Sequence, residues 1–230
     1  MHIIITGASR GIGYELAKFF AKQAENKILL LSRNVDRLQE LSANSPHANI
    51  DWLAYDLTRA EEAKLLEKIK PWNHIDILVN NAGQLLSKPF TELTRHDWES
   101  IFTTNLFGVV DLVRLLLPKL EAANHGHVLN IGSMGGFQGS SKFPGLSAYS
   151  ASKAALANLT ECLAEEYKEK GPAFNCLSLG AVQTEMLAEA FPGYEAPVGS
   201  QDMGAFIAWF ATNGHRFFNG KILPVSISTP

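Results

Sequence analysis

The 230-residue sequence has only two cysteines, Cys162 and Cys176, and no long apolar run. Two thiols are too few for a disulfide framework, and without a secretory signal they favour a reducing compartment. The apolar run at residues 3–5 stops at Gly7, so it is too short for the core of a signal peptide. No stretch approaches the ~20 apolar residues of a membrane span. We therefore expect a cytoplasmic protein.

An excess of charge of either sign is also missing. The 20 basic and 23 acidic side chains give a net charge of −3, and no basic stripe favours nucleic acid or a membrane surface. No cluster of residues suggests a metal site. A composition of 46% hydrophobic and 19% charged residues is that of a globular protein. With no linker to divide it, the chain is expected to form one domain over residues 1–230.

Short apolar runs alternate along the chain with helical patterns. Strands are predicted at residues 2–6, 27–31, 50–54, 75–79, 127–131, 173–177 and 221–225. Helices are predicted at residues 14–24, 35–41, 58–69 (capped by Thr58), 97–123, 148–170 and 201–212. This alternation predicts an α/β fold, a single-domain doubly wound (Rossmann-like) parallel sheet of about seven strands with helices on both faces. A ligand is then expected at the carboxyl ends of the strands.

A glycine-rich loop joins the first predicted strand to the first predicted helix. Its spacing is G-x-x-x-G-x-G, and its candidate cofactor-binding residues are Gly7, Ser9, Arg10, Gly11, Ile12 and Gly13. Glycines let the backbone approach a phosphate closely, and a helix N-terminus offers free N–H groups and a positive dipole end. The alternative is an ordinary glycine-rich turn, but its place after the first strand favours nucleotide binding.

The end of the second predicted strand bears on which nucleotide binds. Enzymes that use NAD place an acid there, on the ribose hydroxyls. This chain instead has Ser32, Arg33 and Asn34, and Asp36 already lies in the following helix. Arg33 and Arg10 are therefore expected to flank a 2′-phosphate, which favours NADP(H) over NAD(H). Two solvated arginines remain the alternative.

Tyr149 and Lys153 stand four residues apart in a predicted helix, so they share one face. A neighbouring cation favours the phenolate and is expected to lower the tyrosine pKa. Tyr149 is therefore a candidate general acid and base.

Taken together and in order, these motifs resemble the short-chain dehydrogenase/reductase family over residues 6–184. The resemblance implies hydride transfer between a nicotinamide and a carbonyl or alcohol carbon. It adds cofactor-binding residues after the third, fourth and sixth strands, and two polar residues near the active site. These are Asp56, Leu57, Asn81, Ala82, Gly83, Gly180, Val182 and Thr184 for the cofactor, and Asn105 and Ser133 for the active site.

The same resemblance implies a role for each catalytic candidate. Ser133 would orient the substrate oxygen and Tyr149 would transfer the proton. Lys153 would hold the ribose hydroxyls, and Asn105 would support a water that links the lysine to solvent. These donors are expected to stabilise the charge that develops on the substrate oxygen.

Three departures from the family pattern leave alternatives open. Ser133 precedes Tyr149 by 16 residues, which by resemblance is a longer gap than usual, so Ser140, Ser141 and Ser147 compete for the role of Ser133. Leu179 replaces a proline before Gly180, and loosening of the loop around the nicotinamide is expected. The tail at residues 224–230 lacks the family's Asp-Gly-Gly. An NADP(H)-binding sensor or interaction protein with little catalytic activity is therefore the alternative function.

Two further expectations concern the surroundings of the site. Residues 185–200 are predicted to form a substrate lid that is partly apolar, with Leu85, Leu86, Phe137 and Phe143 as further walls. The two longest helices are expected to expose apolar side chains such as Val113, Leu116 and Leu159. By resemblance to the family, such faces pair subunits into a homodimer or homotetramer.

Overall fold

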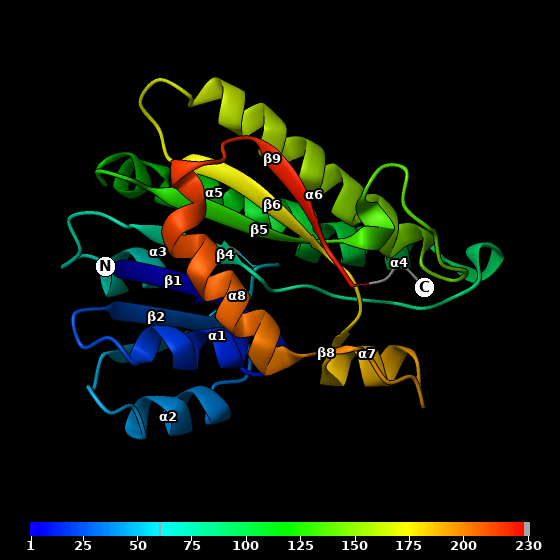
Figure 1. Ribbon diagram of the computed structural model, residues 1–230, viewed down its shortest axis with the longest axis horizontal. Coiled ribbons are helices and arrows are strands. Elements are labelled where there is room, and N and C mark those ends of the chain that lie inside the picture. The colour runs from blue at the N-terminus through cyan, green and yellow to red at the C-terminus, as the bar shows by residue number, and fades with distance from the viewer. Residues whose placement is uncertain (60, 228–230) are drawn as a thin grey trace.

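The computed structural model describes residues 1–59 and 61–227 and contains a seven-stranded parallel sheet (Figure 1). Its strands lie in the order β3-β2-β1-β4-β5-β6-β9. They are β1 His2–Thr6, β2 Lys27–Ser32, β3 Ile50–Ala54, β4 Ile77–Asn80, β5 His127–Ser133, β6 Ala173–Leu179 and β9 Lys221–Val225. The predicted doubly wound parallel sheet is confirmed.

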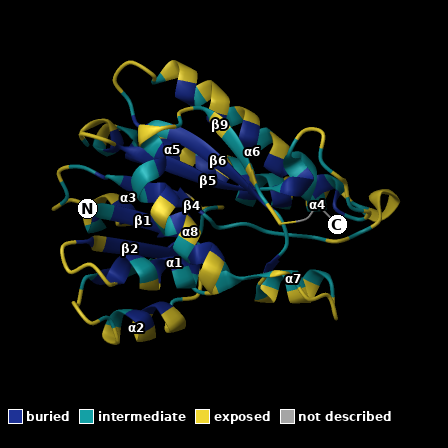
Figure 2. Ribbon diagram, in the orientation of Figure 1, coloured by how far each residue is buried: buried dark blue, intermediate teal, exposed yellow. Residues whose placement is uncertain are grey.

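Helices cover both faces of this sheet (Figures 1 and 2). One face is covered by α1 Gly11–Ala21, α2 Asp36–Ala43 and α8 Ser200–Asn213. The other is covered by α3 Glu62–Lys68, α5 Gly108–Glu121 and α6 Ser147–Glu166, with α4 Arg95–Phe102 beside α6. Figure 2 shows buried strands between helices whose outer surfaces are exposed.

The alternation of side chains along each strand divides the core into two layers. On β1, Ile3 and Ile5 pack with α1 and α8, whereas Ile4 packs with the helices of the opposite face. All three are fully buried, and burial of one such side chain contributes about 1.5–3 kcal/mol. The apolar runs read from the sequence are therefore continuous because both faces of the sheet are covered.

The helices predicted at 14–24 and 148–170 end earlier in the structure, at Ala21 and Glu166, and two other predicted helices differ more. The helix predicted from Thr58 begins only at Glu62, because the Thr58 hydroxyl donates to Asp56 Oδ1 at 2.8 Å in a turn before it. The helix predicted over 97–123 consists of α4, a π-helical segment η2 Thr103–Phe107, and α5. In η2 the hydrogen bonds have a wider spacing that apolar periodicity does not reveal.

The continuous helical segment Arg95–Glu121 is, by length and a mean hydropathy of 1.5, long and apolar enough to cross a membrane. No such stretch was expected from the sequence. Packing explains part of its apolar character, because residues of α5 lie against the central sheet and 39% of the most apolar window is buried. The expectation that Val113 and Leu116 are exposed is wrong, since they are 4% and 0% exposed. Leu159 on α6 is partly exposed.

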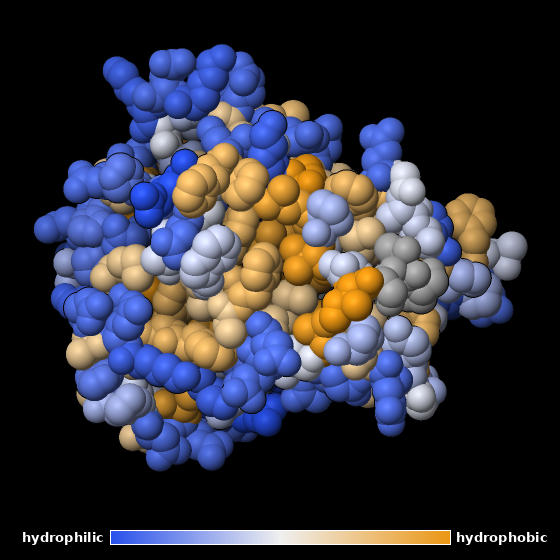
Figure 3. Space-filling view, viewed as in Figure 1, coloured by the Kyte–Doolittle hydropathy of each residue, from blue (hydrophilic) through white to orange (hydrophobic). Residues whose placement is uncertain are grey.

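Exposed apolar side chains gather instead around α8. In the space-filling view, apolar surface extends over α8 and β9 (Figure 3). Phe206 and Trp209 on α8 are 37% and 55% exposed, and Phe217, after the short 3-10 helix η4 Gly214–Arg216, is 67% exposed. Helix α8 packs on α1 over one face of the sheet, whereas Phe217 precedes β9, the last strand of the sheet.

The predicted lid contains a helix and part of a second, small sheet. Helix α7 Glu185–Ala190 follows β7 Val182–Gln183, and β8 Val198–Gly199 pairs with β7. The lid is therefore tied back to the fold at both ends. At the C-terminus, residues 228–230 of the tail lie outside the described part of the chain.

Candidate cofactor and active site

A cavity of about 480 Å³ lies at the carboxyl ends of the strands. Most site residues predicted from the sequence line it, and they come from loops far apart in the chain. They are Gly7, Ser9, Arg10, Gly11, Ile12, Arg33, Asp56, Leu57, Asn81, Ala82, Gly83, Ser133, Tyr149, Lys153, Gly180, Val182 and Thr184. Gly13 and Asn105 do not line it; both stand behind residues that do.

The glycine loop after β1 needs its glycines for two reasons. Gly7 and Gly11 have φ values of 66° and 55°, in the left-handed region that strains other residues. A side chain at Gly13 would bring its Cβ to 2.5 Å from Asn81 Nδ2, and one at Gly7 would approach Ala82 Cα to 2.7 Å. The loop can therefore pack closely on the end of β4 and expose its backbone to the cavity.

Thr6 and Asn81 hold this arrangement together. The backbone N–H groups of Asn81 and Ala82 each donate to the Thr6 hydroxyl at 3.0 Å. The Asn81 side-chain amide donates to the carbonyl oxygens of Thr6 and Gly7 at 3.0 and 3.1 Å. Asn81 was predicted as a cofactor ligand, but its amide is engaged in bracing the glycine loop. Thr6 directly precedes the glycines of the loop but was not among the predicted cofactor-binding residues.

Tyr149 and Ser133 meet in the cavity. Ser133 ends β5 and Tyr149 lies in the first turn of α6, so each is held on a rigid element. Burial raises the pKa of Tyr149, and a hydrogen bond with Ser133 lowers it by less, so the net pKa lies above its ordinary value. The expected lowering by Lys153 is wrong for this structure, in which the lysine ammonium is 6.0 Å from the Tyr149 ring centre.

Lys153 is buried and donates from Nζ to the carbonyl oxygen of Ile131 at 2.7 Å. Burial lowers the pKa of Lys153 from 10.5 to about 8. Gly83 leaves room beside it, because a Cβ at that position would lie 3.5 Å from the ammonium. The lysine therefore projects along the wall of the cavity between β5 and the loop after β4.

Asn105 lies in η2 and is fully buried. Its side-chain amide donates to Gln84 O and Ser152 Oγ, both at 2.9 Å, and its Oδ1 accepts from Gln84 N at 2.7 Å. These three bonds join the loop after β4 to helix α6. A Cβ at Gly83 would lie 3.5 Å from Asn105 Oδ1, so the asparagine stands directly behind that loop.

The competing serines lie elsewhere. Ser140 donates to the carbonyl oxygens of Met134 and Phe137, while Ser141 is exposed. Ser147 Oγ is buried, and no described residue pairs with it. Ser133 alone of the four candidates lines the cavity among the described residues. The long gap before Tyr149 is taken up by the loop that follows β5.

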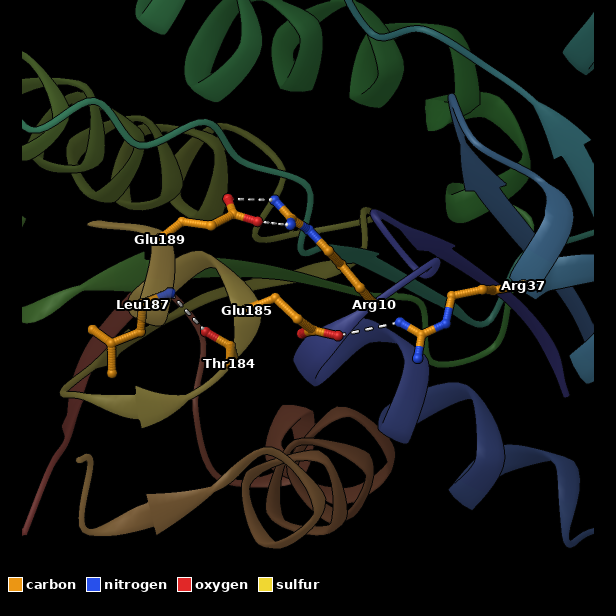
Figure 4. A network of polar contacts seen from close by, with 6 residues as sticks. All are labelled: Arg10, Arg37, Thr184, Glu185, Leu187 and Glu189. Carbon is orange, nitrogen blue, oxygen red and sulfur yellow. Dashed lines mark hydrogen bonds and ion pairs between the residues drawn. The ribbon is translucent and has the colours of Figure 1, made fainter. Parts of the chain in front are cut away.

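Two ion pairs that the sequence did not predict lie at the nucleotide side of the cavity. Arg10, at the N-cap of α1, is paired with Glu189 of α7, and Arg37 donates to Glu185 at 3.1 Å (Figure 4). The Glu189 hydrogen bond raises the pKa of Arg10. Both acids lie in the predicted lid, which was expected to be partly apolar and for which no charged role was predicted. No local pattern marks an ion pair between residues nearly 180 positions apart.

Apolar residues line the rest of the cavity. They include Met186, Leu187, Phe191 and Tyr194 from the lid, and Leu85, Leu146 and Phe143 from other loops. Of the predicted wall residues, Leu86 and Phe137 are not among those that line it.

A second polar cluster lies at the opposite, amino-terminal edge of the sheet. The side chains of His2, His74 and Asp76 each have an atom able to bind a metal, and these atoms lie within 4.8 Å of one another. The backbone N–H of His2 donates to Asp76 Oδ2 at 2.7 Å, and the same oxygen lies 3.3 Å from His74 Nε2. These contacts tie the start of β1 to the residues before β4.

Comparisons with known proteins agree with this geometry. The sequence model of a family described as short chain dehydrogenase matches residues 1–195. An uncharacterized oxidoreductase of Staphylococcus saprophyticus is 33% identical over 205 residues, which cover 87% of this chain and 86% of that protein. A short chain dehydrogenase of Shigella flexneri, solved with NADP, is 27% identical with a TM-score of 0.87, covering 97% of this chain and 95% of its own. A 4-hydroxyisoleucine dehydrogenase solved with NADH is 24% identical with a TM-score of 0.85, covering 98% and 96%, and supports the fold alone.

Proposed function

The chain belongs to the short chain dehydrogenase family, and we propose that it transfers a hydride between NADP(H) and a carbonyl or secondary alcohol. Family membership makes it an NAD(P)-dependent oxidoreductase. The substrate class and the proton-transfer role of Tyr149 are proposed here and do not follow from family membership alone. The observation that supports them best is that Tyr149, Ser133 and Lys153 line one cavity with the glycine loop, where Ser133 acts on the Tyr149 hydroxyl so as to lower its pKa.

The residues around the cavity fit a dinucleotide. The close packing of Gly7 on Ala82 leaves the backbone of the glycine loop facing the cavity, where it can approach a bound pyrophosphate. The N-terminus of α1 supplies a positive dipole end beside this backbone. In this proposal Lys153 would hold the ribose hydroxyls, and Gly180, Val182 and Thr184, which line the same cavity, would hold the nicotinamide end. When bound, the nicotinamide supplies or accepts the hydride.

The remaining chemistry is assigned to the side chains of this chain. Ser133 donates a hydrogen bond to the substrate oxygen, and Tyr149 gives its proton to that oxygen in reduction or takes it in oxidation. Asn105 braces the loop after β4 and supports a water that links Lys153 to solvent. Rigid placement of Ser133 and Tyr149 on β5 and α6 supports this preorganised geometry.

The preference for NADP(H) is supported by the end of β2. Arg33 lines the cavity there, together with Arg10, and their guanidinium groups suit a 2′-phosphate. The nearby acid, Asp36, is exposed in the first turn of α2 and does not line the cavity. The Ser32 hydroxyl donates to Ser9 Oγ at 3.0 Å, so the end of β2 bears directly on the glycine loop.

The test of the proposed function is a Tyr149→Phe variant with Tyr167→Phe as its matched control. Tyr167 is the C-cap residue that follows α6 and does not line the cavity. Tyr149→Phe is expected to lower NADPH-dependent reduction of a carbonyl panel about a hundredfold or more, while NADPH still binds. Retained turnover in Tyr149→Phe would remove the proton-transfer role. A wild-type chain that binds NADPH tightly and reduces no carbonyl would favour the sensor alternative.

We also propose that the chain is a cytoplasmic homodimer or homotetramer. The pairing surface must differ from the one expected, because Val113 and Leu116 are buried within the chain. The exposed aromatic surface of α8, next to the open edge strand β9, supports pairing with a second copy there. Light scattering at micromolar concentration should show an oligomer that Trp209→Glu dissociates. A monomeric wild-type chain would contradict the proposal.

A further inference from the structure

Two acids of the lid helix α7 neutralise two arginines next to the glycine loop (Figure 4). Arg10 pairs with Glu189 through both guanidinium Nη atoms, the longer bond being 3.3 Å. Arg37 pairs with Glu185 through one bond of 3.1 Å. The two ends of α7 are therefore held to α1 and α2 by separate ion pairs, one at Glu185 and one at Glu189.

The two pairs differ in their relation to the cavity. Arg10 lines it together with Arg33, the other arginine assigned to a 2′-phosphate, whereas Arg37 does not line it. Arg37 instead lies over the Tyr14 ring, with its guanidinium carbon 5.2 Å from the ring centre. Glu189 is thus paired with the guanidinium of Arg10, which an incoming 2′-phosphate needs. Glu185 is paired with the guanidinium of Arg37, which the phosphate does not need.

The Arg10–Glu189 pair is also weak enough to exchange. Its side chains are 44% and 62% exposed, and ion pairs so exposed to water and salt contribute little to stability. A phosphate monoester carries up to two negative charges and three acceptor oxygens, so it is a stronger partner for a guanidinium than one carboxylate. A 2′-phosphate can therefore take Arg10 from Glu189, but binding then includes the cost of breaking that pair.

We propose that Glu189 is a specificity-determining residue that competes with the 2′-phosphate of NADP(H) for Arg10. NADP(H) binding releases α7 at the Glu189 end, while the Arg37–Glu185 pair still holds its beginning. NAD(H), which has no 2′-phosphate, leaves the Arg10–Glu189 pair intact. The inference rests on the proposed binding of NADP(H), and it assigns to the lid a part in choosing the cofactor.

The experiment compares Glu189→Gln with Glu185→Gln by equilibrium titration with NADPH and with NADH. Glu189→Gln is expected to tighten NADPH binding about three- to fivefold, the size of one exposed ion pair, and to leave NADH affinity unchanged. Glu185→Gln removes the same charge from the same helix at a residue that lines the cavity and acts on Arg10 without a hydrogen bond to it, so it is expected to change the ratio of NADPH to NADH affinity less than Glu189→Gln does. In an Arg10→Gln background, Glu189→Gln should no longer alter NADPH affinity.

The proposed competition would be refuted if both glutamine variants changed the ratio of NADPH to NADH affinity equally. It would also be refuted if Glu189→Gln bound NADPH more weakly than the wild type does. An effect of Glu189→Gln that persists in the Arg10→Gln background would also overturn it. Failure of the proposed function looks different: the wild-type chain would bind neither NADPH nor NADH, and both proposals would then fall. Normal NADPH binding with an inert Glu189→Gln variant would remove only the competition.

Discussion

Replacing Lys153 by methionine should make the protein more stable near neutral pH while abolishing turnover. The pKa of Lys153 is lowered by burial from 10.5 to about 8, which corresponds to a penalty of about 3 kcal/mol when both folded and unfolded chains carry the charge. Methionine keeps an unbranched apolar side chain, but it loses the hydrogen bond to Ile131 O, at a cost of about 1 kcal/mol. The net gain at pH 7 is therefore about 2 kcal/mol.

The sign of the pH dependence follows from the two protonation states. The unfolded chain holds the lysine proton up to a pH near 10.5, whereas the folded chain releases it near pH 8. Between these values the unfolded state binds more protons, so the stability of the wild-type chain rises with pH. Below pH 8 the penalty is fully present, and near pH 10.5 it has disappeared. The advantage of Lys153→Met should therefore shrink from pH 8 upward and reverse.

Urea denaturation at pH 7, 8, 9 and 10 measures this difference, with Lys168→Met as the control. Lys168 is half-exposed and pairs with Glu165 on the surface, so its removal should leave the pH profile parallel to that of the wild type. A Lys153→Met chain that is less stable than the wild type at pH 7 and runs parallel to it up to pH 10 would refute the reasoning. The site lysine would then not be a destabilising charge.

Three further predictions follow from the same contacts. Asn105→Ala should lower the free energy of unfolding by about 2–3 kcal/mol, because three buried hydrogen bonds are lost, whereas Asn158→Ala at an exposed position should have little effect in the same urea assay. Gly13→Ala should weaken NADPH binding at least tenfold in a fluorescence titration, since its Cβ would lie 2.5 Å from the amide that braces the glycine loop, and Gly199→Ala, whose Cβ meets its nearest atom at 3.8 Å, should bind normally. Burial lowers the pKa of His127 to about 4, so the unfolded state binds more protons than the folded state between pH 6.5 and 4. The free energy of unfolding of the wild type should therefore fall by about 3 kcal/mol as the pH is lowered over that range. A His127→Gln variant whose stability falls equally steeply would contradict this.

The fold was readable from the sequence because its strands are buried on both faces. The predicted bounds of β1, β3 and β9 agree with the structure. Glycine marks the end of β1 at Gly7 and the start of β9 at Gly220. Helix interiors were also recognised. Boundaries failed where a side chain took a local partner, as at Thr58, or where the hydrogen-bond pattern changed, as in η2.

The candidate site was predictable to the extent that its residues follow strands. Parallel strands end at one edge of a sheet, so polar residues directly after them must gather there. The charged lid was not predictable, because Glu185 and Glu189 meet arginines through folding alone. The missing proline at Leu179 is a different case. The backbone after it is held by a bond of 2.9 Å from Gly180 N to Val225 O, a contact with β9 that no local pattern could indicate.

The site combines rigid placement with locally unfavourable burial. Ser133 lies on β5, and Tyr149 and Lys153 lie on α6. The packing of these two elements holds the three side chains in place even where their burial is unfavourable. Burial raises the pKa of the phenol and lowers that of the lysine, so both groups are pushed toward their neutral forms. A bound cofactor and substrate oxygen offer new hydrogen-bond partners to these groups. Such partners would favour the charged forms of the phenol and the lysine, which burial disfavours.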